Sequence, residues 1–221
     1  MFLADASNSG STSASGSNTI TTVGTGTVTG APDTLTIGIG VSTTAPHAAA
    51  ALSRNNDIAA KVQQALSRDG VADKDIQTTG LSLQQAYPPS DGYQAYDEVT
   101  ATIHDITKAG SVIDDALAPA GDAGRLQMVN FSLSSTDPFM ASARRTAVAS
   151  AKAEAEQLAS AAGVHVGPLV SISVQQSPGY PQVFGAAPAG IAQGSAGTSV
   201  PLQAGSQQVT VDVTTVWAIA P

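Results

Sequence analysis

The longest regular pattern of apolar and polar residues covers 138–163 and predicts a helix. Asp137 is a suitable N-cap, Pro138 fits the first helical position, and Gly163 suits the left-handed conformation that often ends a helix. Apolar residues recur there at steps of three and four, at Phe139, Ala143, Ala147, Ala151, Ala155, Leu158 and Ala162. Because most of them are alanine, we expect the helix to lie close against a flat surface such as a sheet.

Alternation between apolar and polar residues predicts strands in seven other stretches. These are residues 20–29, 35–41, 76–87, 93–105, 126–135, 170–174 and 209–219. Helical spacing predicts two further helices, from Pro46 to Gly70 and from Asp105 to the residue before Pro119. The apolar parity changes across Gly80, which predicts a β-bulge.

An internal repeat links two of these helices. The stretches LTIGIGVSTTAP and LQMVNFSLSSTDP each precede a helix, with the prolines 92 residues apart and the closing glycines, Gly70 and Gly163, 93 apart. Each copy reads as strand, helix, strand. The repeat predicts an α+β fold with a mixed or antiparallel sheet, built from two strand–helix–strand units whose helices pack on one face of a shared sheet.

The composition of the chain limits which partners it can bind and indicates how its segments are organised. Seventeen acidic and nine basic residues give a net charge of −8, which disfavours nucleic acid and anionic membrane surfaces. No apolar run approaches the roughly 20 residues that span a bilayer, and cysteine is absent. We expect a flexible linker at 1–18, consistent with a removed export signal and lipid anchor, and one domain at 19–221. Residues 180–199, rich in Gly, Pro, Ala and Gln, predict a mobile insert.

No group of titratable residues predicts catalysis. The three histidines, His47, His104 and His165, are scattered, so we expect exposed side chains and no metal ligands. The adjacent carboxyl pairs 97–98 and 114–115 diverge on a strand or a helix. Asp97 is unusual because it shares its parity with apolar neighbours. We therefore predict no catalytic, cofactor-binding or metal-binding residues.

Aromatic residues offer the candidate contact surface. Tyr87, Tyr93 and Tyr96 flank the proline-rich turn between two predicted strands, where they serve either core packing or contact with another molecule. We hypothesise a contact surface for a homo-oligomer or another protein partner. The alternative is a small-molecule binding module using a cleft between the two strand–helix–strand units.

Several stretches together resemble the SIMPL-domain family of bacterial envelope proteins. The matching stretches, between Thr19 and Pro221, are VGTGTVTGAPDTLTIGIGVST, GVADKDIQTTGLSL, GYQAYDEVTATI, AAGVHVGPLVSISV and SVPLQAGSQQVTVDVTTVWAI. The polar first residues also look like those of a lipoprotein cut after its lipidated residue.

The resemblance implies a secreted, periplasmic or lipid-anchored protein that is not an enzyme. Family members are associated with protection against oxidative stress and with immunogenicity, and one forms a ring-shaped oligomer. The family offers no catalytic residues to carry over to this sequence. The insert at 180–199 departs from the compact family pattern, which leaves open whether the same oligomer forms.

Overall fold

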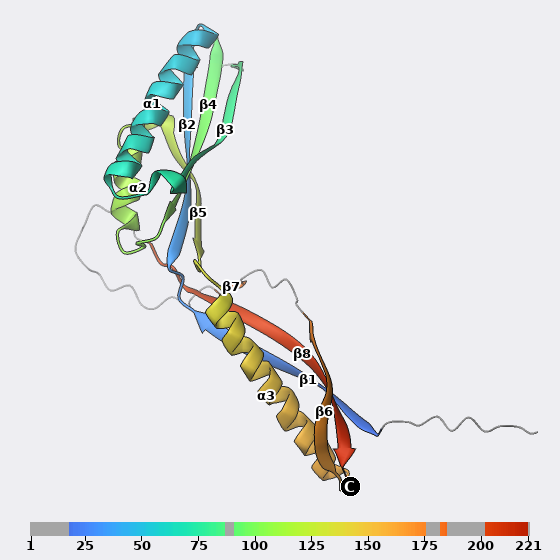
Figure 1. Ribbon diagram of the computed structural model, residues 1–221. Helices are drawn as coiled ribbons and strands as arrows, with labels where there is room; N and C mark the ends of the chain where they lie inside the picture. The colour runs from blue at the N-terminus through green and yellow to red at the C-terminus, as the bar shows by residue number, and fades with distance from the viewer. Residues whose placement is uncertain (1–17, 87–90, 176–181, 185–201, 221) are drawn as a thin grey trace, which may run out of the picture. The chain divides into compact units, whose positions relative to one another are not determined.

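The computed structural model describes residues 18–86, 91–175, 182–184 and 202–220 (Figure 1). The chain divides into two compact units. Unit 1 comprises Met1–Thr27, Met140–Pro178 and Thr210–Pro221, and unit 2 comprises Val28–Phe139 and Gly179–Val209. Each unit therefore joins segments that lie far apart in the sequence.

Unit 2 contains a four-stranded antiparallel sheet of order β3-β4-β2-β5. Its elements are β2 (Thr34–Ala45), α1 (Ala48–Arg68), η1 (Asp73–Asp75), β3 (Ile76–Gln85), β4 (Tyr93–Ile103), α2 (Ala109–Leu117), η2 (Gly121–Ala123) and β5 (Gly124–Ser132). The helices α1 and α2 connect β2 to β3 and β4 to β5 and cover one face of the sheet (Figure 1). This β-α-β-β-α-β order with two crossover helices is the ferredoxin-like arrangement.

Large aliphatic side chains form the core of unit 2. Alternate residues of β2 and β4 point toward the helices and meet the apolar stripes of α1 and α2. The fully buried members include Leu35, Ile37, Ile39, Val41, Val62, Leu66, Val99 and Ile113. Burial of these side chains holds the helices on the sheet.

The second sheet has the order β1-β8-β6, and β7 also pairs with β8. Its elements are β1 (Thr19–Gly30), α3 (Asp137–Ala161), β6 (His165–Gln175), β7 (Gln182–Phe184) and β8 (Ser206–Ala220). In unit 1, α3 lies along one face of this sheet (Figure 1). Among the strands that the structure describes, β6 is an edge strand, because β8 is its sole neighbour.

Glycine and alanine form the contact between α3 and β1. A Cβ atom at Gly24 would overlap the Ala147 carbonyl oxygen, and it would lie 2.5 Å from the Ala151 nitrogen. A Cβ atom at Gly26 would overlap the Ala143 carbonyl oxygen in the same way. The Thr22 hydroxyl donates a 2.8 Å hydrogen bond to the Ala151 carbonyl. The helix backbone therefore rests directly on the strand backbone, as the alanine stripe predicted.

The α+β class, the antiparallel pairing and the bulge at Gly80 are confirmed. The single shared sheet is wrong, because β5 pairs within unit 2 whereas α3 leads to β6 in the other sheet. The apolar stripe of the long helix was predicted to include Leu158, and this is wrong, because Leu158 is 48% exposed. The neighbouring Ala159 is buried instead. Asp105 precedes α2 in a turn, where its carboxylate accepts a hydrogen bond from the Thr107 backbone N–H.

The predicted linker at 1–18 and mobile insert at 180–199 lie largely outside the described residues. Within the insert, Gln182–Phe184 forms β7 and pairs with Ser206–Gln208 of β8. Mobility of the remaining residues stays a prediction.

Candidate interaction surfaces

The tyrosines that we singled out do not form one surface in the described part of the chain. Tyr93 and Tyr96 lie at opposite parity on β4, so their side chains point to opposite faces of the sheet. Tyr87 is outside the described residues. A contact surface that uses all three tyrosines therefore stays a prediction.

Tyr96 lies on the face of the unit 2 sheet that the helices leave uncovered. Its hydroxyl sits over Gly40, where a Cβ would lie 2.9 Å from the tyrosine oxygen. Partial burial and the nearby Glu98 and Asp97 charges raise the pKa of Tyr96, so its hydroxyl stays protonated. Hydrogen bonds cross three strands beside it, from Gln84 to Gln94 and from Gln94 to Ser42. This face is hydrogen-bonded and polar.

Tyr93 instead shares the helix-facing side of the sheet with two exposed leucines on β3. Leu83 pairs with Ala95 and Leu81 with Asp97, and residues directly opposite each other point to the same face. Leu81 is 62% exposed and Tyr93 39% exposed, because both lie at the margin of the sheet. We call Leu81, Leu83 and Tyr93 the β3 patch. It is an apolar surface formed by the edge strand β3 and the neighbouring end of β4.

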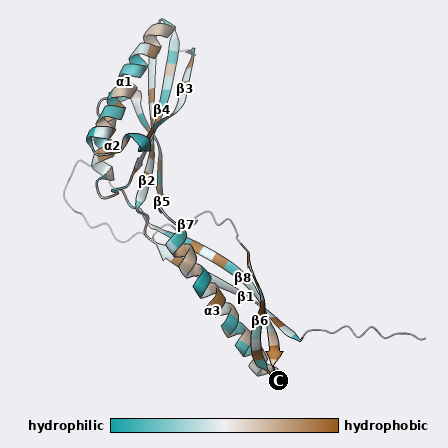
Figure 2. Ribbon diagram, viewed as in Figure 1, coloured by the Kyte–Doolittle hydropathy of each residue, from teal (hydrophilic) through white to brown (hydrophobic). Residues whose placement is uncertain are grey.

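A larger group of exposed apolar side chains lies on β6 in unit 1. Figure 2 shows the hydropathy of the residues along this strand. We call this group, which comprises Leu169, Val170, Ile172 and Val174, the β6 strip. Ile172 pairs with Thr215, and the buried Thr215 contacts Thr22 beneath α3, so Ile172 points to the α3 side of the sheet. Ile172 is nevertheless 46% exposed. The helix rests on β1 and leaves this side of β6 open.

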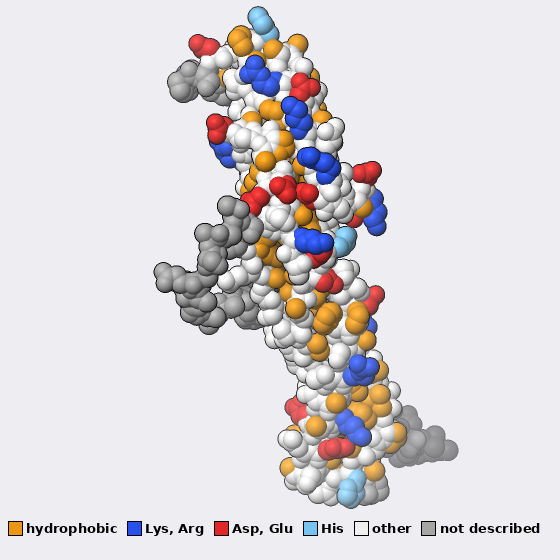
Figure 3. All heavy atoms as spheres, turned by 90° about the vertical axis from the view of Figure 1, so that its left-hand side faces the viewer, with side chains coloured by type: hydrophobic (Ala, Val, Ile, Leu, Met, Phe, Trp, Pro, Cys, Tyr) orange, Lys and Arg blue, Asp and Glu red, His pale blue; other side chains and the backbone are white. Residues whose placement is uncertain are grey.

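The two units differ in charge. Unit 2 carries thirteen acidic and six basic residues, a formal charge of −7. The described residues of unit 1 have three of each, and these are Arg144, Arg145, Lys152, Glu154, Glu156 and Asp212. Figure 3 shows, for one face of the molecule, the Lys and Arg side chains in blue and the Asp and Glu side chains in red. The β6 strip therefore belongs to a unit whose described residues carry no net charge, and the β3 patch belongs to an acidic unit.

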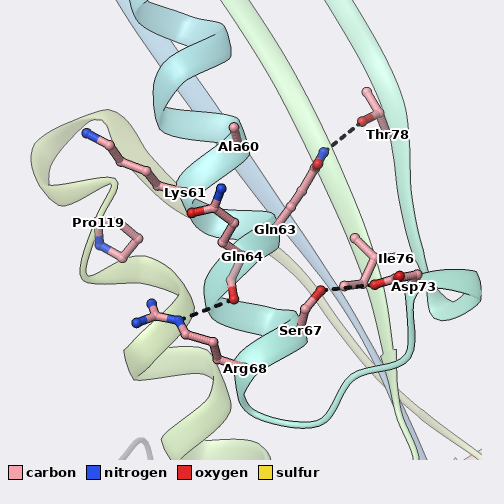
Figure 4. Close-up of a pocket in the computed structure, with 10 residues that line it drawn as sticks. All are labelled: Ala60, Lys61, Gln63, Gln64, Ser67, Arg68, Asp73, Ile76, Thr78 and Pro119. Carbon is pink, nitrogen blue, oxygen red and sulfur yellow. Dashed lines mark hydrogen bonds between the residues drawn. The ribbon is translucent and has the colours of Figure 1, made fainter.

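One hollow in unit 2 lies between α1 and β3 and has a volume of about 1060 Å³. Figure 4 shows its polar side chains bonded to one another, Gln63 to Thr78 and Ser67 to Asp73. None of the residues that line it is buried. It is therefore a concave stretch of surface and does not enclose a ligand.

A smaller hollow of about 270 Å³ lies where η1 meets the end of β4. The buried Val71, Ile103 and Val112 form its apolar floor. At its rim, the Nε2 atom of His104 lies 3.3 Å from the Oδ2 atom of Asp75. His104 is exposed, as expected, with 58% of its side-chain surface accessible, and the structure places it beside a carboxylate. Asp75 directly precedes β3 and His104 directly follows β4, and these two strands pair in the antiparallel sense. Their positions at the open end of a predicted hairpin could therefore have indicated the pair.

Asp97 lies on the helix-facing side of β4, as its parity predicted. It is only 6% exposed, and burial raises the pKa of its carboxyl group. The Asn55 amide donates hydrogen bonds to the carbonyls of Val41 and Ala95, which flank this position. Within the part of the chain that the structure describes, the Oδ1 atoms of Asn55 and Asp97 have no hydrogen-bond partner. Two buried acceptors therefore lie beneath α1 without donors.

Neither hollow adds a metal centre to this picture. Within the described ranges, no three His, Asp or Glu side chains are grouped so that they could hold an ion. In the same part of the chain, every helix is too short or too polar to cross a membrane.

Comparison with known proteins supplies relatives of similar length. The chain is 30% identical over 220 residues to the 26 kDa periplasmic immunogenic protein of Brucella melitensis, with 90% of this chain and 84% of the relative covered. It is 28% identical to the uncharacterized protein YggE of Edwardsiella ictaluri, covering 76% and 74%. The Escherichia coli YggE is 30% identical, covering 69% and 64%.

A solved structure, the regulatory subunit of aspartate kinase from Thermus flavus, matches at 16% identity. The match covers 89% of each chain with a TM-score of 0.25, which is too low to support a shared fold. The model of the SIMPL family, described as a protein of unknown function (DUF541), matches residues 20–217. This match confirms the resemblance seen in the motifs, and the chain belongs to the SIMPL family.

Proposed function

We propose that this protein is a non-enzymatic, extracytoplasmic protein of the cell envelope that acts through self-assembly or partner binding. The observation that carries the proposal is the gathering of exposed apolar side chains on the edge strands β3 and β6. Exposed apolar groups on an edge strand favour addition of a strand from another chain. Among the described residues, the uncovered face of the unit 2 sheet is mainly polar, with Met128 exposed opposite Gly38.

The location rests on the relatives. The printed names of the Brucella proteins describe them as periplasmic and immunogenic, and this supports an envelope location and a role as an antigen. Lipid anchoring concerns the first residues of the chain, which lie outside the described ranges, and it stays a prediction. Roles in stress protection or host interaction also stay predictions.

The test of self-assembly is the mass of the full chain in solution. We expect light scattering coupled to size exclusion to give a mass above the 22.0 kDa of one chain, and the mass should rise with concentration. A mass of one chain at every concentration up to hundreds of micromolar would contradict self-assembly. Partner binding would then be the remaining form of the proposal.

Small-molecule binding is the second candidate function. The hollow beside His104 supports it, because an apolar floor under a few polar groups is typical of ligand sites. Its volume of about 270 Å³ suits only a small ligand. A fragment screen by NMR should shift the signals of His104 and Val71 together if this hollow binds ligands, and an unperturbed hollow would remove the candidate.

A further inference from the structure

We propose that two copies of this chain pair through β6, strand against strand and antiparallel, so that the unit 1 sheets join into one continuous sheet. This inference rests on the proposed self-assembly and specifies its surface. The site is the free edge of β6 from Ser171 to Gln175, together with the β6 strip beside it.

The free edge of β6 is open to pairing over half of its length. Pro168 has no N–H and interrupts the first half of the strand, where the pairing with β8 is also irregular. From Ser171 to Gln175 the pairing with β8 is regular, and no proline or charged residue blocks the outer edge. Natural edge strands are usually protected by such residues. The second half of β6 therefore presents a usable row of backbone donors and acceptors.

The apolar side chains of β6 suit a second copy of the same strand. A two-fold axis perpendicular to the sheet near residue 173 pairs each β6 with its mate in the antiparallel sense, and the α3 side stays the same in both copies. Residues opposite each other share a face, so Ile172 and Val174 of both copies meet on the α3 side. Side chains that are half exposed in one chain are then covered by identical side chains of the other.

Charge favours this surface over the β3 patch. Every copy carries −8, and contact between two unit 2 surfaces brings two charges of −7 together. The described residues of unit 1 have no net charge, so contact there avoids that repulsion. Leu81 of the β3 patch also lies directly opposite the acidic Asp97 on β4. Among the described edge strands, β6 thus has the largest number of exposed large apolar side chains, and it lies in the less charged unit.

The decisive experiment compares two matched lysine substitutions in the full chain by sedimentation equilibrium. Ile172→Lys places two like charges together at the proposed axis, and we expect the dimer dissociation constant to rise about 100-fold or more. Leu81→Lys adds the same charge to the β3 patch on the other exposed edge, and we expect the dimer to persist. Circular dichroism identical to wild type establishes that both variants are folded.

A cross-linking experiment covers the case in which Ile172→Lys fails to fold. The chain has no cysteine, so Ser173→Cys gives a single thiol on the exposed outer side of β6. In the proposed dimer the two introduced thiols lie within about 8 Å, and a short bismaleimide should join them. Thr25→Cys on the exposed side of β1 is the matched control, and we expect it to stay uncoupled.

Each outcome separates the two proposals. Retention of the dimer in Ile172→Lys, loss of it in Leu81→Lys, or equal cross-linking of both cysteine variants would overturn pairing through β6 and leave self-assembly standing. A wild-type chain that stays monomeric at every concentration would overturn both. A dimer lost in Ile172→Lys alone, with cross-linking confined to Ser173→Cys, supports the β6 contact.

Discussion

Units 1 and 2 hold helices against sheets in opposite ways. In unit 2, long aliphatic side chains such as Ile39 and Leu66 fill the space between the two layers. In unit 1, Ala143, Ala147 and Ala151 lie against glycines of β1, and backbone meets backbone. A layer of large side chains leaves a cavity when one is truncated, whereas a contact between backbones has no room for an added atom. The two units should therefore differ in which substitutions they tolerate.

The same contrast bears on function. The wide layer of unit 2 buries its apolar residues under two helices, whereas the single helix of unit 1 covers β1 and leaves β6 open. Because α3 packs closely on β1, the neighbouring β6 keeps an exposed apolar surface. The unit with the smaller contact layer is the one that offers a surface to another chain.

The largest effect is expected for Leu66→Ala in unit 2. Leu66 is fully buried, and its truncation should lower the free energy of unfolding by about 2–5 kcal/mol through lost burial and a cavity. The sole tryptophan, Trp217, is buried in unit 1, so its fluorescence reports on that unit, while circular dichroism reports on both. We expect the circular dichroism transition to move and the fluorescence transition to stay. Equal movement of both would show that the two units unfold as one.

An added methyl group should destabilise unit 1. A Cβ at Gly26 overlaps the Ala143 carbonyl oxygen, so Gly26→Ala should lower the free energy of unfolding by about 1–3 kcal/mol. Gly80→Ala in unit 2 is the matched control, because its Cβ would find Glu98 at 3.5 Å, an ordinary contact. Circular dichroism during urea unfolding, which reports on both units, measures the difference. If the two alanine variants were equally stable, the backbone contact of unit 1 would be looser than described.

Local elements were predictable because their signals are local. The long helix was assigned at 138–163 and spans Asp137–Ala161, and the glycine that changes parity marks the bulge in β3. The shared sheet was wrong because a strand–helix–strand pattern does not encode which strand pairs with which. The two helices of the repeat lead to different sheets, and that choice depends on contacts between residues far apart in the chain. Leu158 was misplaced because the buried face repeats strictly every four residues, ending at Ala159.

The candidate surfaces were only partly predictable. Parity along β4 already implies that Tyr93 and Tyr96 face opposite sides, but it does not reveal that the exposed leucines of β3 lie beside Tyr93. The strand containing Ile172 was predicted, but its exposure depends on where α3 rests across the sheet. Pro168 within an apolar run was the available signal, because proline in a strand is typical of an edge.

A pH effect should distinguish the buried carboxyl group of unit 2. The pKa of Asp97 in the folded protein lies above its ordinary value of 3.8, so the unfolded state releases this proton more readily. The contribution of Asp97 to stability is therefore greatest at acid pH and falls as the pH rises from 3.8 through the folded pKa. Asp97→Asn cannot ionise, and its stability relative to wild type should rise over that range. Urea unfolding at several pH values measures the free energy of unfolding of both proteins. A difference between them that does not change with pH would show that Asp97 ionises as readily in the folded as in the unfolded state.

The smallest effect concerns the charge difference between the units. If copies meet through unit 1, whose described residues carry no net charge, the repulsion between them comes chiefly from the −7 of unit 2. Such repulsion is screened by salt, since the Debye length falls from about 30 Å at 0.01 M to about 8 Å at 0.15 M ionic strength. We therefore expect association to tighten by a few fold between these salt concentrations and then to level off, as apolar pairing itself needs no ions. Sedimentation at both ionic strengths measures the change. Association that weakens with salt would mean that ion pairs hold the copies together, and the neutral surface of unit 1 would then be the wrong contact.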